Sequence, residues 1–129
     1  MQYPINRYSL TKELITTGTL TIIDEGNAIE LVYVDSVIKE SARELHHPLT
    51  ALESLRKTLE TKHCSLLNCN GCRIDTAYRA TGVSEVYLIE DGKRATKSVD
   101  MFEPTKEIAK LCTVEEHELA YDKWLDSLK

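Results

Sequence analysis

Residues 66–74 read LLNCNGCRI, and the local structure of this stretch decides the fold that the sequence predicts. Asn70-Gly71 favours a two-residue hairpin loop, because a type I′ turn needs positive φ at both central residues. The flanking segments 64–68 and 73–78 have the composition of short strands. The stretch therefore predicts a β-hairpin in which Cys69 and Cys72 are cross-strand partners.

Two further hairpins are predicted, one on each side of this stretch. Residues 17–23 and 28–34 are β-branched and alternating, and a four-residue loop, Asp24 to Asn27, separates them. Residues 84–89 and 95–101 flank the charged segment 90–94 in the same way. Three hairpins are thus expected to supply the strands of one antiparallel sheet.

Two helices are predicted between the first hairpin and LLNCNGCRI. Asp35-Ser36 favours the N-terminus of a helix that continues to Leu45. Pro48 suits the first turn of the next helix. The apolar face of that second helix is predicted to contain Leu49, Leu52, Leu55 and Leu59, with Glu53, Arg56, Lys57 and Glu60 directed away from it.

Two more helices are predicted after the third hairpin. Pro104 is expected to begin a short helix through Leu111. Thr113 and Glu116 form a capping box for a final helix. Its predicted apolar face contains Val114, Tyr121, Trp124, Leu125 and Leu128. The chain is therefore expected to form a single α+β domain over residues 1–129, with helices covering one face of the sheet.

Charge and composition limit the classes of partner. The chain has 21 acidic and 16 basic residues and a formal net charge of −5, which argues against nucleic acid or an anionic membrane as partner. The first residues lack the apolar core of a signal peptide, and no apolar run has the length of a membrane span. A cytoplasmic location is therefore expected, where thiols are normally reduced.

The four cysteines allow several interpretations. Zinc coordination would draw on Cys64, Cys69, Cys72, Cys112 or His117 as ligands, but the chain has a single CxxC, and Gly71 precedes its second cysteine instead of following it. The spacing of the first three cysteines also matches a plant-type iron–sulfur pattern, although residues 65–68 resemble a buried strand. A redox thiolate is usually activated at a helix N-terminus, whereas this pair brackets a predicted turn. Packed free thiols with no cofactor and no metal are preferred.

Acidic side chains supply the candidate partner-binding residues. Glu90 and Asp91 are placed at the tip of the third hairpin, where turn chemistry alone also explains them. The final helix carries Glu115, Glu116, Glu118 and Asp122, whose alternative role is to complement the helix dipole. Together these six carboxylates are predicted to meet a basic protein partner.

Few residues indicate catalysis, and no catalytic residue is predicted. Arg73 and Asp75 are two apart on a predicted strand, so they share a face and favour a structural ion pair over an enzyme site. His46 and His47 stand at a helix junction, where capping or solvation is favoured over metal binding. The chain has no phosphate-binding loop, GxSxG or HExxH motif.

Five segments carry a resemblance to known proteins: HPLTALESLRKTLE, LLNCNGCRIDTAYRATG, VYLIEDGK, VDMFEP and TVEEHELAYDKWLDSL. They resemble a pattern in small bacterial proteins of unannotated function, in which a leucine-striped helix precedes an LLxxGxRxD segment, a serine or threonine followed by glycine, and two strands. Thr81 stands where serine is usual. The matching positions are Leu66, Leu67, Gly71, Arg73, Asp75, Thr81, Gly82, Tyr87, Leu88, Gly92, Val99, Asp100, Phe102, Pro104 and Trp124.

In size and make-up these proteins are similar to immunity proteins of contact-dependent or other polymorphic toxin systems. The resemblance implies a bacterial protein that neutralises a cognate toxin through a tight complex, with carboxylates steering a basic toxin surface. A cysteine-ligated zinc protein and a small enzyme with an unrecognised site remain the alternatives.

Overall fold

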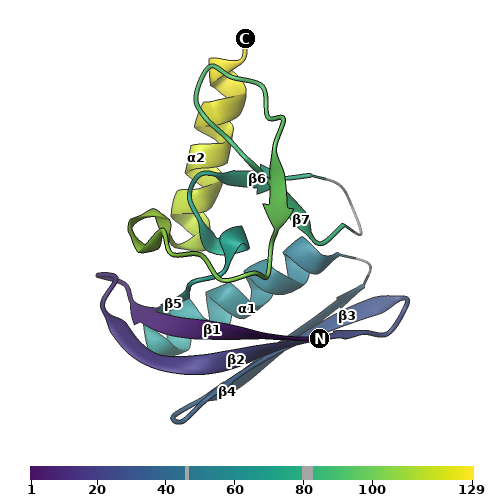
Figure 1. Cartoon of the computed structure of the whole chain (residues 1–129), viewed down its shortest axis with the longest axis vertical. Helices are drawn as coiled ribbons and strands as arrows, with labels where there is room; N and C mark the ends of the chain where they lie inside the picture. Colours follow the sequence, from purple (N-terminus) through teal and green to yellow (C-terminus); the bar gives the residue numbers. More distant parts are fainter. Residues whose placement is uncertain (46, 80–82) are drawn as a thin grey trace.

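The computed structural model describes residues 1–45, 47–79 and 83–129. These residues form an α+β fold, as predicted, but their strands make two antiparallel sheets instead of the single sheet that was expected (Figure 1). The larger sheet has the strand order β4-β3-β2-β1-β5, and the smaller sheet has the order β6-β7-β8. The strands are β1 Gln2–Ser9, β2 Leu14–Asp24, β3 Ala28–Asp35, β4 Lys39–Leu45, β5 Ser65–Leu67, β6 Thr76–Tyr78, β7 Glu85–Leu88 and β8 Ser98–Asp100.

Helix α1, Pro48–His63, lies on one face of the larger sheet and separates it from the smaller one (Figure 1). Its leucine face is buried in the main core: Leu52, Leu55 and Leu59 are fully inaccessible to solvent. The sheet contributes Ile5, Leu20, Leu31 and Tyr33 to the same core. The predicted start of this helix at Pro48 is confirmed.

Helix α2, Val114–Ser127, stands beside the smaller sheet (Figure 1). The predicted capping box is confirmed: Thr113 Oγ1 accepts from the Glu116 amide, and the Glu116 carboxylate accepts from the Thr113 amide. Trp124 is buried and donates through Nε1 to the Lys93 carbonyl at 2.9 Å. Leu125 and Leu128 were predicted on the buried face but are 40% and 38% exposed, because the side of α2 that packs is narrower than the apolar pattern.

LLNCNGCRI does not form the predicted hairpin. Its first residues form β5, which pairs with β1, and the single-turn 3-10 helix η1 follows at Asn70–Cys72. The following strand, β6, belongs to the other sheet. Gly71 has no positive φ; a Cβ there would lie 2.6 Å from Leu52 Cδ2 and 3.2 Å from the Met101 carbonyl oxygen. Glycine is therefore needed for close packing against α1, not for a type I′ turn.

The helix predicted after Asp35 is strand β4. Asp35 Oδ1 accepts hydrogen bonds from the amides of Val37 and Ile38 at 2.8 and 2.9 Å, as an N-cap would. The chain then reverses and pairs with β3 along its whole length, from Val34↔Lys39 to Ala28↔Leu45. Sheet pairing has overridden the local helix preference of residues 37–45.

The predictions for the remaining elements are partly confirmed. The hairpins β2–β3 and β7–β8 are confirmed, whereas strand β1 was not predicted. The helix expected from Pro104 is only the 3-10 turn η2, Ile108–Lys110. Arg56, predicted to face away from the core, is 3% exposed. No helix in the described part of the chain is long and apolar enough to cross a membrane.

Candidate binding pocket

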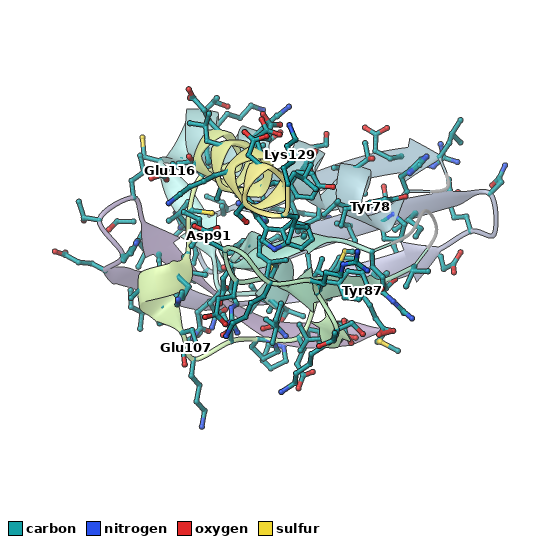
Figure 2. The ribbon with its side chains drawn as sticks, turned by 90° about the horizontal axis from the view of Figure 1, so that it is seen from above. Tyr78, Tyr87, Asp91, Glu107, Glu116 and Lys129 are labelled. Atoms are coloured by element: carbon teal, nitrogen blue, oxygen red, sulfur yellow. The ribbon has the colours of Figure 1, made fainter. Side chains whose placement is uncertain are left out.

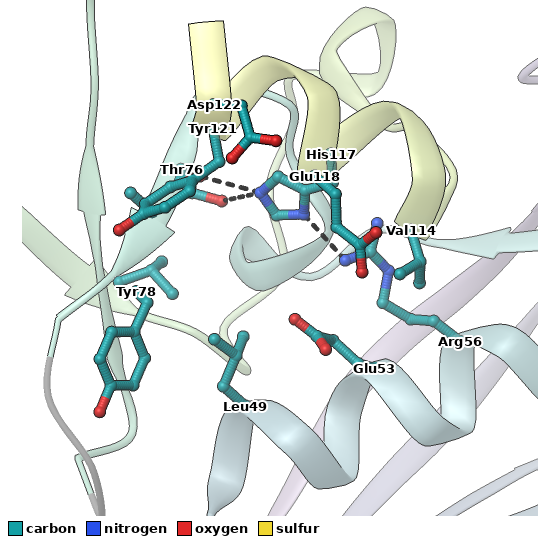
Figure 3. Close-up of a pocket in the computed structure, with 12 residues that line it drawn as sticks. Leu49, Glu53, Arg56, Thr76, Tyr78, Val114, His117, Glu118, Tyr121 and Asp122 are labelled. Carbon is teal, nitrogen blue, oxygen red and sulfur yellow. Dashed lines mark hydrogen bonds between the residues drawn. The ribbon is translucent and has the colours of Figure 1, made fainter. Parts of the chain in front are cut away.

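A pocket of about 430 Å³ lies where α1, α2, β6 and β7 meet (Figure 3). Its wall combines apolar side chains with two tyrosines, three carboxylates and an Arg–His pair of which the arginine is buried. The residues that line it are Leu49, Glu53, Arg56, Thr76, Ala77, Tyr78, Val86, Val114, His117, Glu118, Tyr121 and Asp122.

Three residues from three elements form the hydrogen-bonded floor of the pocket. Arg56 of α1 donates from Nη1 to Nδ1 of His117 in α2, at 2.9 Å. His117 Nε2 lies 2.8 Å from the Thr76 carbonyl oxygen in β6. Figure 3 shows this chain of contacts across the pocket. The floor therefore ties both helices to the smaller sheet.

These contacts fix the protonation state of His117. A guanidinium can only donate, so Nδ1 must accept, and Nε2 must carry the proton that it donates to the Thr76 carbonyl. Burial, followed by the positive charge of Arg56, lowers the pKa of His117 to about 4. His117 is therefore neutral near pH 7, with both ring nitrogens already engaged.

Arg56 also binds two backbone carbonyl groups next to the pocket floor. Besides His117, it donates to the carbonyls of Gly71 and Cys112, at 3.3 and 2.9 Å. No carboxylate of the described residues lies within 4.0 Å of its guanidinium. This buried cation is thus stabilised by carbonyl oxygens and by an imidazole instead of an ion pair.

The upper part of the pocket is acidic. Glu53 is half-buried, and burial raises the pKa of its carboxyl group, helped by the negative charge of Glu118 and opposed by Arg56. Glu118 and Asp122 are exposed one turn apart on α2. In Figure 3 the Glu53 carboxylate extends from α1 into the pocket, on the side where Glu118 descends from α2. The pocket therefore presents carboxylates above a neutral histidine.

The six predicted partner-binding carboxylates do not form one patch. Glu118 and Asp122 line the pocket, whereas Glu115 and Glu116 lie in the first turn of α2, with Glu116 engaged in the capping box. In Figure 2, where α2 is seen nearly end-on, Glu116 lies on one side of the helix and Tyr78 on the other. Glu90 and Asp91 form ion pairs with Lys93 and Lys123, at 3.2 and 3.3 Å.

The cysteines are arranged as two separate environments. Cys64 is exposed at the end of α1, while Cys69, Cys72 and Cys112 are buried. Within residues 1–45, 47–79 and 83–129, no group of three or more His, Cys, Asp or Glu side chains is placed to hold a metal ion. His117, the other alternative ligand, is engaged with Arg56 and Thr76.

Cys69 and Cys72 are close, but not as cross-strand partners. Their sulfurs lie 3.0 Å apart across η1. Either thiol of the pair can donate to the other, and this bond, with burial, holds the pKa of Cys69 well above its usual value. Burial alone would raise the pKa of Cys72 as well, but the same bond and the charge of Arg56 lower it. Burial raises the pKa of Cys112 to about 12.

The other residues considered for chemistry have structural contacts. Arg73 forms a bidentate ion pair with Asp75, through bonds of 2.8 and 2.7 Å, so the predicted ion pair is present. His47 is the N-cap residue of α1 but makes no side-chain capping bond. His46 lies outside the described residues.

Sequence reasoning missed most of the pocket. Glu53 and Arg56 were expected to face solvent, and Thr76, Tyr78 and Tyr121 were not proposed as site residues. Arg56 follows Leu52 by one helical turn, so a wider buried stripe on α1 would have included it. The contribution of β6 carried no local signal, because it depends on the second sheet.

No protein-family model matches the chain, and no curated protein sequence matches it. The chemistry of the pocket must therefore be judged from its own side chains.

Proposed function

We propose that this protein is a binding module whose pocket accepts a basic side chain of a protein partner. The observation that carries the proposal is the placement of Glu53, Glu118 and Asp122 around one pocket. Among the described residues of the lining, the only other charged side chain is Arg56, whose guanidinium is buried and turned toward backbone carbonyls. A lysine or arginine that entered between the carboxylates would gain charge-assisted hydrogen bonds.

The aromatic and apolar lining supports the same class of ligand. Tyr78 and Tyr121 stand at the pocket with Leu49, so the methylene stem of a long basic side chain would meet apolar surface while its charged end met the carboxylates. Partial burial makes such charge pairs stronger than pairs in bulk water.

The polar groups of the floor are better suited to holding the pocket together than to catalysis. Both nitrogens of His117 are engaged, and a general base needs a free lone pair within reach of its proton. The Thr76 hydroxyl donates to the Arg73 carbonyl at 2.8 Å, so it is not poised as a nucleophile.

We further propose that the partner is a cognate toxin and that the protein acts as an immunity protein in the bacterial cytoplasm. The resemblance of residues 46 to 128 to small bacterial proteins, similar in type to immunity proteins, supports this step. The net charge of −5 supports a basic partner, whose association would be steered by electrostatic attraction. Occupation of the pocket by a toxin side chain would anchor the complex and cover the toxin surface around it.

The test is a protection assay with candidate toxin domains sought among the genes beside the one that encodes this protein. Cells that express the toxin and this protein are expected to grow. The double variant Glu118→Arg/Asp122→Arg should lose protection, because it places two cations against a basic partner. Glu115→Arg/Asp126→Arg is the matched control: it makes the same change of charge at two exposed positions of α2 outside the pocket lining, and it should protect.

Binding of the purified pair separates loss of affinity from poor expression. The wild-type affinity is expected to fall as salt concentration rises, with a shallower dependence in the double variant. Equal affinity and equal salt dependence in the wild type and the double variant would remove the pocket from the interface. Binding without any protection would reject the toxin assignment alone.

A further inference from the structure

The turn η1 holds two thiols in the geometry of a disulfide precursor. The sulfurs of Cys69 and Cys72 are 3.0 Å apart, and the Cys72 amide donates to the Cys69 carbonyl at 2.9 Å. Such an i→i+3 bond keeps the two Cα atoms within about 7 Å of each other. Disulfides span Cα separations of about 4.4–6.8 Å, so a bond between these sulfurs needs only a small side-chain movement.

A buried cation lies against this turn. Arg56 donates to the Gly71 carbonyl, between the two cysteines, and its Nη2 lies 3.8 Å from the Cys112 sulfur. A guanidinium at this place stabilises a thiolate, and the pKa of Cys72 is lowered while that of Cys69 is raised. One sulfur of the pair therefore has nucleophilic character, and the other keeps its proton.

Cys112, the third buried cysteine, is not arranged to replace Cys69 or Cys72 as a reacting thiol. The Cys112 sulfur lies 3.6 Å from the Cys72 carbonyl oxygen, to which it donates, and its pKa is raised to about 12. Cys64 is exposed and stands at the left-handed C-cap of α1. The geometry thus distinguishes Cys69 and Cys72 from the other two cysteines.

We propose that Cys69 and Cys72 are a redox-active dithiol that hydrogen peroxide converts into a reversible intrachain disulfide. The Cys72 thiolate attacks one peroxide oxygen, the O–O bond breaks, and the departing hydroxide takes a proton to become water. Cys72 is then a sulfenic acid. The Cys69 sulfur attacks the Cys72 sulfur, the S–O bond breaks, and the hydroxyl group leaves as water with the Cys69 proton. The dithiol loses two electrons, and peroxide is reduced to two waters.

Burial should make this dithiol react selectively with small oxidants. Cys69 and Cys72 are 0% and 1% exposed. A small neutral oxidant can reach such sulfurs during brief openings of the turn, whereas glutathione disulfide is too bulky to be attacked in place. Peroxide is therefore expected to act faster on the folded protein than glutathione disulfide. The proposal is independent of the binding function of the pocket.

The Cys64→Ser variant makes the test unambiguous. Trypsin releases residues 63–73 from this variant as one peptide with Cys69 and Cys72 as its only cysteines, while Cys112 lies on the separate peptide 111–123. The folded variant is treated with hydrogen peroxide, its remaining thiols are alkylated, and the digest is analysed by mass spectrometry. The expected result is an unlabelled peptide 63–73 that is lighter by about 2 Da, the two hydrogens lost on disulfide formation. Dithiothreitol should restore two labels.

Each other outcome overturns the proposal. A doubly labelled peptide would mean that the pair is inert, and a cross-link between peptides 63–73 and 111–123 would assign the reactive pair to Cys112. An equal rate with glutathione disulfide would contradict the selectivity.

Two further variants serve as controls. Cys112→Ser should leave the disulfide unchanged, and Cys72→Ser should abolish it. If Cys72→Ser fails to fold, the peptide map of Cys64→Ser decides alone.

Discussion

Nη1 of Arg56 donates a hydrogen bond to Nδ1 of His117 across 2.9 Å, which joins the middle of α1 to the first turn of α2. The contact lies under the pocket and next to η1, so it links the acidic lining to the buried dithiol. Burial, and then the permanent cation that this contact places against the imidazole, lower the pKa of His117 and keep it neutral.

Replacement of Arg56 by methionine should destabilise the protein. The methionine would fill part of the space but leave the Gly71 and Cys112 carbonyls without donors, at a cost of about 2 kcal/mol in the free energy of unfolding. Urea denaturation measures this loss. Lys57→Met, at the exposed neighbouring position, should change the stability by less than about 0.5 kcal/mol. Equal stabilities of the two variants would contradict the structural role of Arg56.

The stability of the protein should depend on His117 below neutral pH. The folded pKa is lowered from 6.5 to about 4, so between these values the unfolded state binds more protons. The free energy of unfolding should therefore be constant above about pH 6.5 and fall as the pH drops toward 4, by roughly 3 kcal/mol at most. Glu53 and Glu60, whose pKa values burial raises, act in the opposite direction near the acidic end.

The contribution of His117 is isolated by comparison with His117→Gln, whose amide can accept from Arg56 and donate to the Thr76 carbonyl. Urea denaturation of both proteins at pH 7, 6, 5 and 4.5 gives the difference in stability at each pH. The free energy of unfolding of the variant, relative to that of the wild type, should rise as the pH falls. A difference that does not change with pH would mean that His117 titrates normally.

Asp35→Asn should reveal a buried ion pair in the larger sheet. Arg7 Nε donates to Asp35 Oδ2 at 2.7 Å, and the two side chains are 5% and 0% exposed. Asparagine can keep the bonds to the Val37 and Ile38 amides but leaves the buried guanidinium uncompensated, so a loss of about 3 kcal/mol is expected. Glu25→Gln, which breaks the exposed pair with Arg43, is the control and should cost much less. Thermal or urea denaturation that ranks the two variants equally would contradict this account.

Thr113→Ala should loosen the start of α2. The substitution removes the acceptor of the Glu116 amide at the helix N-terminus. Loss of such a cap costs about 1 kcal/mol. Glu115→Ala, which lies outside the capping box, should cost less in the same denaturation experiment. Faster amide hydrogen exchange confined to the first turn of α2 would locate the effect, and uniform exchange would argue against it.

The sequence predicted those elements whose signals are local. The alternation of β2 and β3 and the capping box of α2 depend on neighbouring residues, and both are found. Strand β4 was missed because Asp35 binds the following amides just as a helix N-cap does. Only pairing with β3 distinguishes a strand from a helix here, and the sequence of residues 37–45 alone does not indicate that pairing.

Contacts between residues far apart in the chain also explain why the structure of the Asn-Gly turn and the pocket were not predicted. Gly71 was taken as a source of positive φ, yet its role is to leave space for Leu52 and Met101, which are 19 and 30 residues away in the chain. The pocket joins Glu53, Thr76 and His117 from three elements. Periodicity places Glu118 and Asp122 on one side of α2, but it does not say which strands stand opposite.

Strand β4 also affects how the molecule behaves in a crowded solution. It is the edge strand of the larger sheet, so one row of its backbone groups has no neighbouring strand among the described residues. An open edge of this kind can recruit an edge of another molecule and start aggregation. Lys39, Glu40, Arg43 and Glu44 put charges of both signs along β4, and bringing a second chain against them would require the removal of their hydration. We therefore expect the charges of β4, the strand that departed furthest from its predicted structure, to disfavour self-assembly through β-pairing.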